Sequence, residues 1–307
     1  MKSRDPSAPE CAGVPVADRR DFLRLAGLGG VAFASGLGLL PRGSAAQPDF
    51  HFVQLSDTHW GYTGPANPHA DTALVRAVEA VNALAQPPAF VVFTGDLTHL
   101  TLDGKQRRER MAKFREIASG LTVKDVHFLP GEHDASVDAG EAYREFFGPT
   151  HYSFDHAGVH FLALDNVSDP RGALGEEQLR WMQEDLDRRP AGSPVVVFAH
   201  RPLFDLAPEW GWATQDGARA VEILSALPRA VVFYGHIHQE NRHEAGKLVH
   251  LAASSLIFPL PAPHSGPDHK PIPWDPAHPW AGIGWREVRH EAEAPAYSVS
   301  QHPMEGA

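Results

Sequence analysis

Short apolar runs alternate with amphipathic segments along most of this chain. The runs, rich in β-branched and aromatic residues, predict strands at 50–55, 90–93, 126–129, 195–198, 230–234 and 248–256. Segments with apolar residues at helical spacing predict helices at 71–85, 104–119, 175–188 and 215–227. Such alternation is typical of an α/β layered fold. Two further runs, 152–154 and 159–164, flank a turn and predict a hairpin, so we expect a mixed sheet.

Polar clusters follow directly after five of these strands. They lie at 56–59, 94–99, 130–134, 199–202 and 235–238, and each contains a histidine or a carboxylate. Ligands of layered α/β folds bind beyond the carboxyl ends of strands, so five clusters in order predict one shared site. Gly95, Gly131 and Gly235 each stand beside a candidate ligand, where glycine permits a sharp turn.

Composition restricts the chemistry of that site. The chain has 19 histidines and one cysteine, Cys11, which excludes a disulfide within the chain and a thiolate metal cage. A transition-metal site must then use imidazole and carboxylate ligands. The net charge is −11 and the body of the chain has no basic block, so we expect no nucleic-acid polymer as a partner. A small anionic substrate stays compatible, because a bound metal reverses the field locally.

The amino-terminal segment, 1–46, resembles a twin-arginine signal peptide of bacteria. Arg19 and Arg20 precede an uncharged run at 25–40, and small residues at 44–46 precede Gln47. The run is too short and too weakly apolar to span a membrane as a helix. An amphipathic amino-terminal helix is the alternative.

Export follows from the first interpretation. We expect the twin-arginine export machinery as a partner and a periplasmic or secreted location. No cysteine follows the apolar run, so we expect no stable membrane anchor.

The polar clusters together resemble the calcineurin-like metallophosphoesterase superfamily. Its motifs D-x-H, GD, GNH(D), H and GHxH are met in order by Asp57 and His59, Gly95 and Asp96, residues 131–134, His200, and residues 235–238. The match spans about 50–238. The resemblance implies two stacked mixed β-sheets flanked by helices, a four-layer sandwich, with a catalytic domain at 47–258.

The resemblance also implies roles for these residues. The first metal would take Asp57, His59 and His238. The second would take His200, His236 and the residue at the family's asparagine position, with Asp96 bridging both ions. His133 would stabilise the phosphoryl group or protonate the leaving oxygen, and Asp134 would orient that imidazole.

The implied activity is that of an exported dinuclear-metal hydrolase of phosphoric esters. Two divalent ions are expected as cofactors, and imidazole with carboxylate admits Mn, Fe, Zn, Co or Ni. A metal-bridging hydroxide would attack a small phosphoester substrate in line. The order of motifs is more similar to the phosphodiesterase branch. The alternatives are a phosphomonoesterase on the same site, a catalytically weak phosphate-ligand-binding module, and a structural metal protein.

Two residues depart from the family pattern. Glu132 stands in place of asparagine, and we predict that it is an anionic ligand of the second metal; alternatively it turns away and water completes the shell. His99 stands where purple acid phosphatases have tyrosine, which disfavours a tyrosinate-coloured iron site. His99 is a candidate substrate contact. Arg201 is a second candidate, for bidentate phosphate contact or else a structural salt bridge.

The last segment, 259–307, differs in composition from the rest. Ten prolines fall in these 49 residues, together with several histidines and tryptophans. We expect an extended or irregular extension of the same domain and assign no secondary structure to it. It would serve as a lid over the site or, alternatively, as an arm packed on the sheet.

Overall fold

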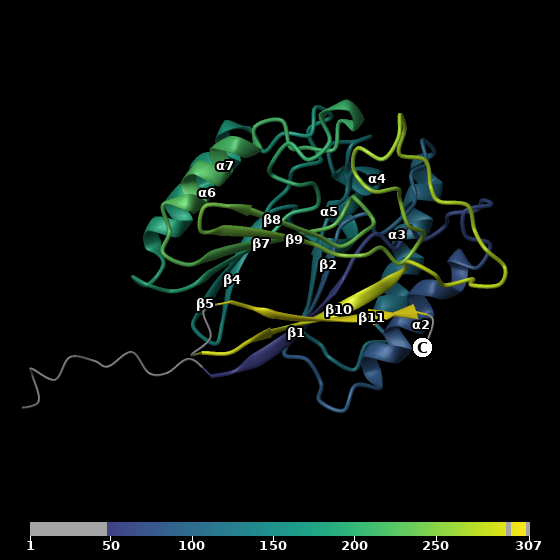
Figure 1. The fold of residues 1–307 in the computed structure, drawn as a ribbon, viewed down its shortest axis with the longest axis horizontal. Coiled ribbons are helices and arrows are strands. Elements are labelled where there is room, and N and C mark those ends of the chain that lie inside the picture. The colour runs from purple at the N-terminus through teal and green to yellow at the C-terminus, as the bar shows by residue number, and fades with distance from the viewer. Residues whose placement is uncertain (1–47, 293–295, 305–307) are drawn as a thin grey trace, which may run out of the picture. The chain divides into compact units, whose positions relative to one another are not determined.

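Two β-sheets, of five and six strands among the described residues, make up the centre of the computed structural model, which describes residues 48–292 and 296–304 (Figure 1). The first sheet has the order β11-β10-β1-β2-β3, with β1 at Phe50–Leu55, β2 at Val91–Thr94, β3 at Val126–Leu129, β10 at Gly284–His290 and β11 at Ser298–Pro303. The second has the order β4-β5-β6-β7-β9-β8, with β4 at Tyr152–His156, β5 at Val159–Ala163, β6 at Val195–Phe198, β7 at Ala230–Tyr234, β8 at Asn241–Ala245 and β9 at Leu248–Ala252.

Both sheets are mixed, as predicted. Strands β1, β2 and β3 run parallel, β10 pairs antiparallel with β1, and β11 pairs antiparallel with β10. In the second sheet β5, β6, β7 and β9 are parallel, and β4 and β8 are antiparallel edge strands. Within each sheet the carboxyl ends of the parallel strands therefore lie at one edge, where the polar clusters of the sequence begin.

Helices cover the outer faces of the sheets (Figure 1). The helical elements of the described residues are α2 at Ala70–Asn82, α3 at Gly104–Ala118, α4 at Glu132–Ala135, α5 at Glu141–Phe147, α6 at Gly175–Arg188, α7 at Gly217–Ser225 and a 3₁₀ turn at Pro208–Trp210. Of these, α4 and the 3₁₀ turn line a cleft at the strand ends instead of covering an outer face. The carboxylate of Asp103 accepts bonds from the amides of Lys105 and Gln106 and so caps α3. Helix α2 begins one residue before and ends three residues before the predicted bounds 71–85.

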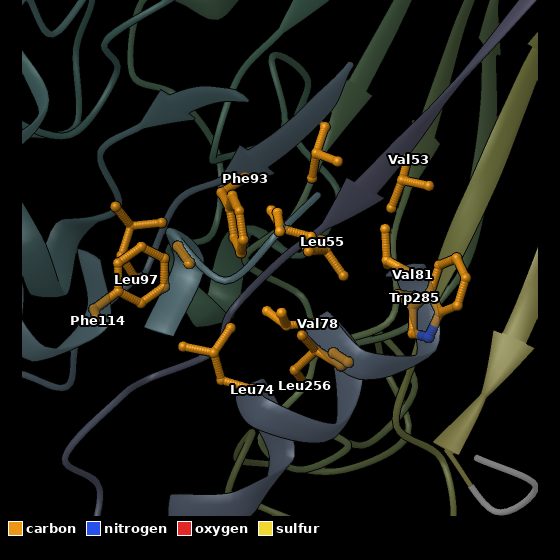
Figure 2. Packing of buried hydrophobic residues seen from close by; sticks show 14 of the residues in the cluster. Val53, Leu55, Leu74, Val78, Val81, Phe93, Leu97, Phe114, Leu256 and Trp285 are labelled. Carbon is orange, nitrogen blue, oxygen red and sulfur yellow. The ribbon is translucent and has the colours of Figure 1, made fainter. Parts of the chain in front are cut away.

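Successive side chains of β1 point to opposite faces of the sheet and therefore pack into different apolar layers. Val53 and Leu55 point toward α2 and pack with Val78 and Val81 of that helix (Figure 2). Phe52 points the other way, into a layer between the sheets, where its ring stacks on Phe90 with centroids 4.9 Å apart. A third apolar layer lies between the second sheet and helices α6 and α7. These three layers confirm the expected four-layer sandwich.

The expectation of an irregular tail is wrong. Strands β10 and β11 both lie in 259–307, and β10 pairs with β1 over five residues from Phe50 to Gln54. Eight of the ten prolines fall at 259–279, ahead of both strands. Only that part follows the irregular course that the composition predicts, because proline cannot donate to a sheet ladder.

Smaller differences have local causes. The expected strand 248–256 ends at Ala252, and β8 was not predicted because its residues, NRHEA, form no apolar run. A turn at Gly246, with φ of +64°, joins β8 to β9. The described residues belong to one compact unit, Gln47–Ala307. Within them we find no helix with the length and apolarity to cross a membrane. The predicted signal peptide lies outside the described residues.

Candidate metal centre

The strand ends bring the seven predicted metal ligands together. They come from the loop after β1 (Asp57 and His59), the loop after β2 (Asp96), the first turn of α4 (Glu132), the loop after β6 (His200) and the loop after β7 (His236 and His238). All are buried except Glu132, which is partly exposed. Both sheets thus contribute ligands to one site.

Five of the seven ligands have a left-handed backbone. The positive φ angles are 53° at Asp57, 43° at His59, 48° at Asp96, 65° at His236 and 55° at His238. This conformation costs about 1–2 kcal/mol for residues other than glycine and concentrates at functional sites. Its recurrence at alternate residues of D-x-H and H-x-H explains how each motif turns two side chains toward one point.

Two glycines allow the loops to approach each other. Gly95 has a φ of +93°, and a Cβ there would collide with the imidazole of His200. A Cβ at Gly235 would lie 2.6 Å from the Asp57 carboxylate. At Gly235, glycine is required because the two loops approach closely. At Gly95 it is required for the same reason and also because its φ is positive.

The first group of donors consists of Asp57, His59 and His238. The Nε2 atoms of the two histidines lie 3.2 Å apart, and Nε2 of His238 lies 3.4 Å from Oδ1 of Asp57. The second group consists of Glu132, His200 and His236. Oε2 of Glu132 lies 2.9 Å from Nε2 of His200, and Oε1 of Glu132 lies 2.9 Å from Nδ1 of His236.

Asp96 stands between the two groups. Its Oδ2 lies 3.4 Å from Nε2 of His59 in the first group and 3.5 Å from Nε2 of His200 in the second. Its other oxygen, Oδ1, accepts a bond of 2.9 Å from the backbone amide of His133. One oxygen is thus held in place while the other faces both groups.

Backbone carbonyls fix the tautomers of two ligands. Nδ1 of His200 lies 2.8 Å from the Thr94 carbonyl, and Nδ1 of His238 lies 2.8 Å from the Phe258 carbonyl. A carbonyl only accepts, so each Nδ1 carries the proton. In the neutral ring, Nε2 then presents a lone pair to the centre, which is the form that binds a metal.

These residues fit divalent ions. Ligand atoms around one ion with bonds of about 2.1 Å lie about 3 Å apart, which matches the separations above. Oε2 of Glu132 and Nε2 of His200 lie 2.9 Å apart but are not aligned as a hydrogen bond, and Nε2 of His236 is buried without a partner among the described residues. Such orphaned polar atoms are costly unless a further group binds them. The donor set contains nitrogen and carboxylate oxygen, which suits Mn, Fe, Zn, Co or Ni.

Electrostatics supports the same conclusion. Burial alone would lower the pKa of His200, but Asp96 and Glu132 raise it well above its usual value. Burial alone would raise the pKa of Glu132, but His236 and His200 hold it well below its usual range. A cation at the site therefore competes with the proton on His200. Metal affinity is consequently expected to fall as the pH is lowered.

His133 lies beside the ligands with a defined proton. Its ring centroid is 4.5 Å from that of His59, and its Nδ1 accepts a bond of 3.0 Å from the amide of Leu100. Because Nδ1 accepts, Nε2 carries the proton in the neutral ring. His133 thus has a hydrogen-bond donor available at Nε2 in the cleft.

The role expected for Asp134 is wrong. Its carboxylate does not orient His133; it accepts bonds from the amides of Gly131, Leu97 and Thr98, at 2.8 to 2.9 Å, and from the Thr98 hydroxyl. Burial and the neighbouring Asp96 raise the pKa of Asp134 to about 7, and the amide bonds act in the opposite direction. Asp134 therefore ties the loop after β2 to α4 and positions Asp96 indirectly.

The two candidate substrate contacts differ in their surroundings. His99 contacts a predicted metal ligand, because its Nδ1 lies 3.3 Å from Nδ1 of His59. Burial, His133 and Arg110 lower the pKa of His99 to about 4, so it is neutral at pH 7. Arg201 lines the cleft with its Nε 3.9 Å from Glu132. That Nε has no hydrogen-bond partner among the described residues.

The cleft also has walls that the motifs do not indicate. Beside the metal ligands it is lined by Trp210, Trp212, Phe258, Leu260, His269 and Pro271. The ring of His269, from the tail, lies 5.6 Å from Trp210 and 5.7 Å from Trp212. Tail residues thus line the cleft, while Trp285 packs in the core. Only the unusual tryptophan and histidine content of the tail signals this in the sequence.

Comparison with known proteins agrees with this geometry. A family model described as calcineurin-like phosphoesterase matches residues 50–240, which include all seven ligands. The chain therefore belongs to the calcineurin-like phosphoesterase family, and it is a metal-dependent phosphoesterase.

Curated relatives are identical to this chain at about a quarter of the aligned positions. A mouse protein named serine/threonine-protein phosphatase CPPED1 is 28% identical over 62% of this chain and 70% of its own length. The Arcobacter nitrofigilis protein named probable glycerophosphodiester phosphodiesterase GpdQ is 27% identical over 66% of this chain and 77% of its own. A protein from Rhodopseudomonas palustris named probable cyclic nucleotide phosphodiesterase is 27% identical over 71% of this chain and 86% of its own length.

Solved structures share the fold at lower identity. A dimetal phosphatase from Danio rerio superposes with a TM-score of 0.59 at 15% identity, covering 83% of this chain and 96% of its own. A purple acid phosphatase from yellow lupin also superposes with a TM-score of 0.59, at 11% identity, covering 84% of this chain and 52% of its own. These likenesses show the four-layer fold.

Proposed function

We propose that this protein hydrolyses phosphodiesters with the help of two divalent ions. The observation that carries the proposal is the place of Asp96, whose single Oδ2 lies within 3.5 Å of a donor from each ligand group. One carboxylate oxygen shared by two complete groups is what a pair of ions requires, whereas a single structural ion needs only one group.

The chain's own groups would complete the reaction around the ions. Divalent ions supply positive charge for the phosphoryl oxygens and acidify a water at neutral pH. Nε2 of His133 has a proton to donate, either to the phosphoryl group or to the leaving oxygen. Arg201 lies across the cleft as a second cation near the substrate. The placement of His133 supports an enzyme rather than a binding module.

Charge favours a diester over a monoester. Three carboxylates, those of Asp57, Asp96 and Glu132, would face two divalent ions and leave one net positive charge. Asparagine in place of Glu132 would leave two net positive charges. A diester carries one negative charge at neutral pH and a monoester close to two, so the present site matches the diester better. The phosphodiesterase names of two relatives point the same way.

A substrate panel tests this proposal. Metal-reconstituted protein is assayed with a chromogenic diester and the matching monoester, and metal content is measured on the same sample. We expect two ions per chain and the larger kcat/KM for the diester. A larger value for the monoester would favour the phosphomonoesterase alternative, and no turnover with two bound ions would favour the binding module.

The charge argument gives a prediction for Glu132. Glu132→Gln keeps the length and removes the charge, so we expect weaker binding of one ion, by roughly 10-fold or more, because an anionic ligand becomes neutral. With metal in excess, the ratio of monoester to diester activity should rise. Isothermal titration and the two-substrate assay provide the measurements.

Two further variants make the result interpretable. Glu132→Asn adds a change of length to the change of charge, and Glu177→Gln removes a charge from an exposed site on α6. The Glu177 variant should behave like wild type. If Glu132→Gln and Glu132→Asn both bind two ions as tightly as wild type, Glu132 is not a ligand.

Export is the second part of the proposal. The paired Arg19 and Arg20 ahead of an uncharged run support a twin-arginine route to the periplasm. Replacing both with lysine should leave the precursor in the cytoplasm, whereas Arg24→Lys should not. Cell fractionation and immunoblotting measure the distribution. Normal export of the double variant would contradict the proposal.

A further inference from the structure

Arg286 of β10 is a buried cation whose hydrogen-bond partners are all neutral groups. It is 2% exposed. Its guanidinium donates to the side-chain oxygen of Gln54 through Nε at 2.9 Å and through a terminal nitrogen at 2.6 Å, and to the carbonyls of Ala252 and Leu251. No carboxylate of the described residues forms an ion pair with it. Glu240 acts on Arg286 only through space, without an ion pair. A buried charge without a directly bonded counterion is costly, so its retention calls for a physical reason.

A chain of hydrogen bonds leads from Arg286 to a metal ligand. From Gln54, Nε2 donates to the Thr94 hydroxyl at 2.9 Å, which donates to the Ser56 hydroxyl at 2.8 Å. The Ser56 hydroxyl donates to Oδ2 of Asp57 at 2.5 Å. All five side chains are buried. We call Gln54, Thr94 and Ser56 the relay residues.

The direction of every bond is fixed from both ends. A guanidinium has no acceptor, so Gln54 must present its oxygen to Arg286 and its NH₂ to Thr94. An ionised carboxylate has no donor, so Ser56 must give its proton to Asp57 and accept from Thr94. Every donor therefore points toward Asp57. Hydrogen bonds aligned in this way polarise one another.

The strand pattern explains how these residues meet. Gln54 lies two residues after Phe52 in β1, and Arg286 lies two residues before Val288 in β10. Phe52 and Val288 belong to the layer between the sheets, so Gln54 and Arg286 point into the same layer. The layer is aromatic around Phe52 and polar next to the metal centre.

We propose that Arg286 and the relay residues hold Asp57 as an oriented carboxylate for the metal ion, with Arg286 as a positioning residue. This inference rests on the proposed metal function. Oδ2 of Asp57 accepts from Ser56, and the amide of His236 donates to both carboxylate oxygens, at 3.0 Å to Oδ2 and 3.1 Å to Oδ1. Only Oδ2 bonds a side chain of the relay, and Oδ1 lies 3.4 Å from Nε2 of His238. Burial lowers the pKa of Arg286 only to about 9, so it stays charged at neutral pH.

Thr94→Val tests the proposal, because it keeps the shape of the side chain and breaks the relay. We measure Mn²⁺ affinity of the full-length protein by isothermal titration. The variant should bind one ion about 10–100-fold more weakly, which is the usual effect of removing a group that orients a ligand. Thr122→Val is the matched control: its hydroxyl donates to Oδ1 of Asn82 ahead of β3, at the opposite end of that strand from the ligand loops and outside the relay. It should bind Mn²⁺ like wild type.

A double variant separates the relay from a merely structural role. Arg286→Lys retains the charge but loses the fork of donors, so it should also weaken binding. Combined with Thr94→Val it should cause little further loss, because the connection is already broken. Additive losses, or wild-type Mn²⁺ affinity in Thr94→Val, would overturn the proposal.

A metal-free measurement keeps the outcomes distinct. Wild type, Thr94→Val, Arg286→Lys and the double variant are unfolded in urea without Mn²⁺, and their midpoints are compared. If the relay connects the two residues, the shift of the double variant is smaller than the sum of the two single shifts. Wild-type protein that binds no Mn²⁺ would contradict the proposed function, and additive urea shifts would then overturn the relay independently.

Discussion

Asp96→Asn should reduce both metal content and turnover by more than any other single ligand substitution. Oδ2 of Asp96 faces donors of both groups, at 3.4 and 3.5 Å, so its loss affects two ions at once. An amide supplies either a neutral oxygen or an NH₂ group there, and only the first can bind a cation. We expect fewer than two ions per chain and kcat lowered by at least about 10²–10³, as when one preorganised electrostatic group is removed.

The measurements are metal analysis of the dialysed protein and kcat under saturating metal. Asp187→Asn is the control, because Asp187 is exposed on α6 and bonds Gln183. The control should keep wild-type metal content and kcat. An Asp96→Asn protein with two ions and near-normal turnover would contradict the shared-ligand assignment, and with it the two-ion proposal.

His133→Ala should lower the rate by about 10²–10⁴, the usual contribution of a general acid, while metal content stays near wild type. His133 lies beside His59, yet the Leu100 amide occupies its Nδ1 and leaves Nε2–H as a donor. If that proton goes to the leaving oxygen, the loss should shrink for nitrophenolate, which leaves without protonation. Rates with nitrophenyl and alkyl esters provide the comparison.

His278→Ala, an exposed histidine of the tail, should leave both rates unchanged. An equal loss for every leaving group would assign His133 to phosphoryl stabilisation instead of proton donation. No loss for either class of ester would contradict any catalytic role for His133.

Local signals made the ligand loops predictable. Each motif sits directly after a short apolar strand, and parallel strands bring their carboxyl ends to one edge, as Asp57 and Asp96 illustrate. The strand boundaries of β3, β6 and β7 follow from the same runs. The place of His99 against His59 required the fold, because no local pattern fixes which neighbour a loop side chain contacts.

Long-range contacts account for what the sequence does not reveal. The carboxylate of Asp134 bonds backbone amides 36 and 37 residues away, whereas its neighbour His133 suggests a local partner. Residues 284–290, GWREVRH, contain two arginines and a glutamate and follow a proline-rich segment, so the sequence predicts no strand there. In the fold, β10 lies between β1 and β11 with Arg286 buried, and its partner Gln54 is 232 residues away.

The pairing of β10 with β1 also fixes an order of assembly. Strand β1 leads into Asp57 and His59, but its antiparallel partner is made more than 200 residues later. During synthesis at about 5–20 residues per second, β1 therefore waits more than roughly ten seconds with one edge unpaired. An open strand edge is a template for intermolecular pairing. The nascent chain is thus most exposed to aggregation before residues 284–290 leave the ribosome, and complete ligand geometry arises only after that point.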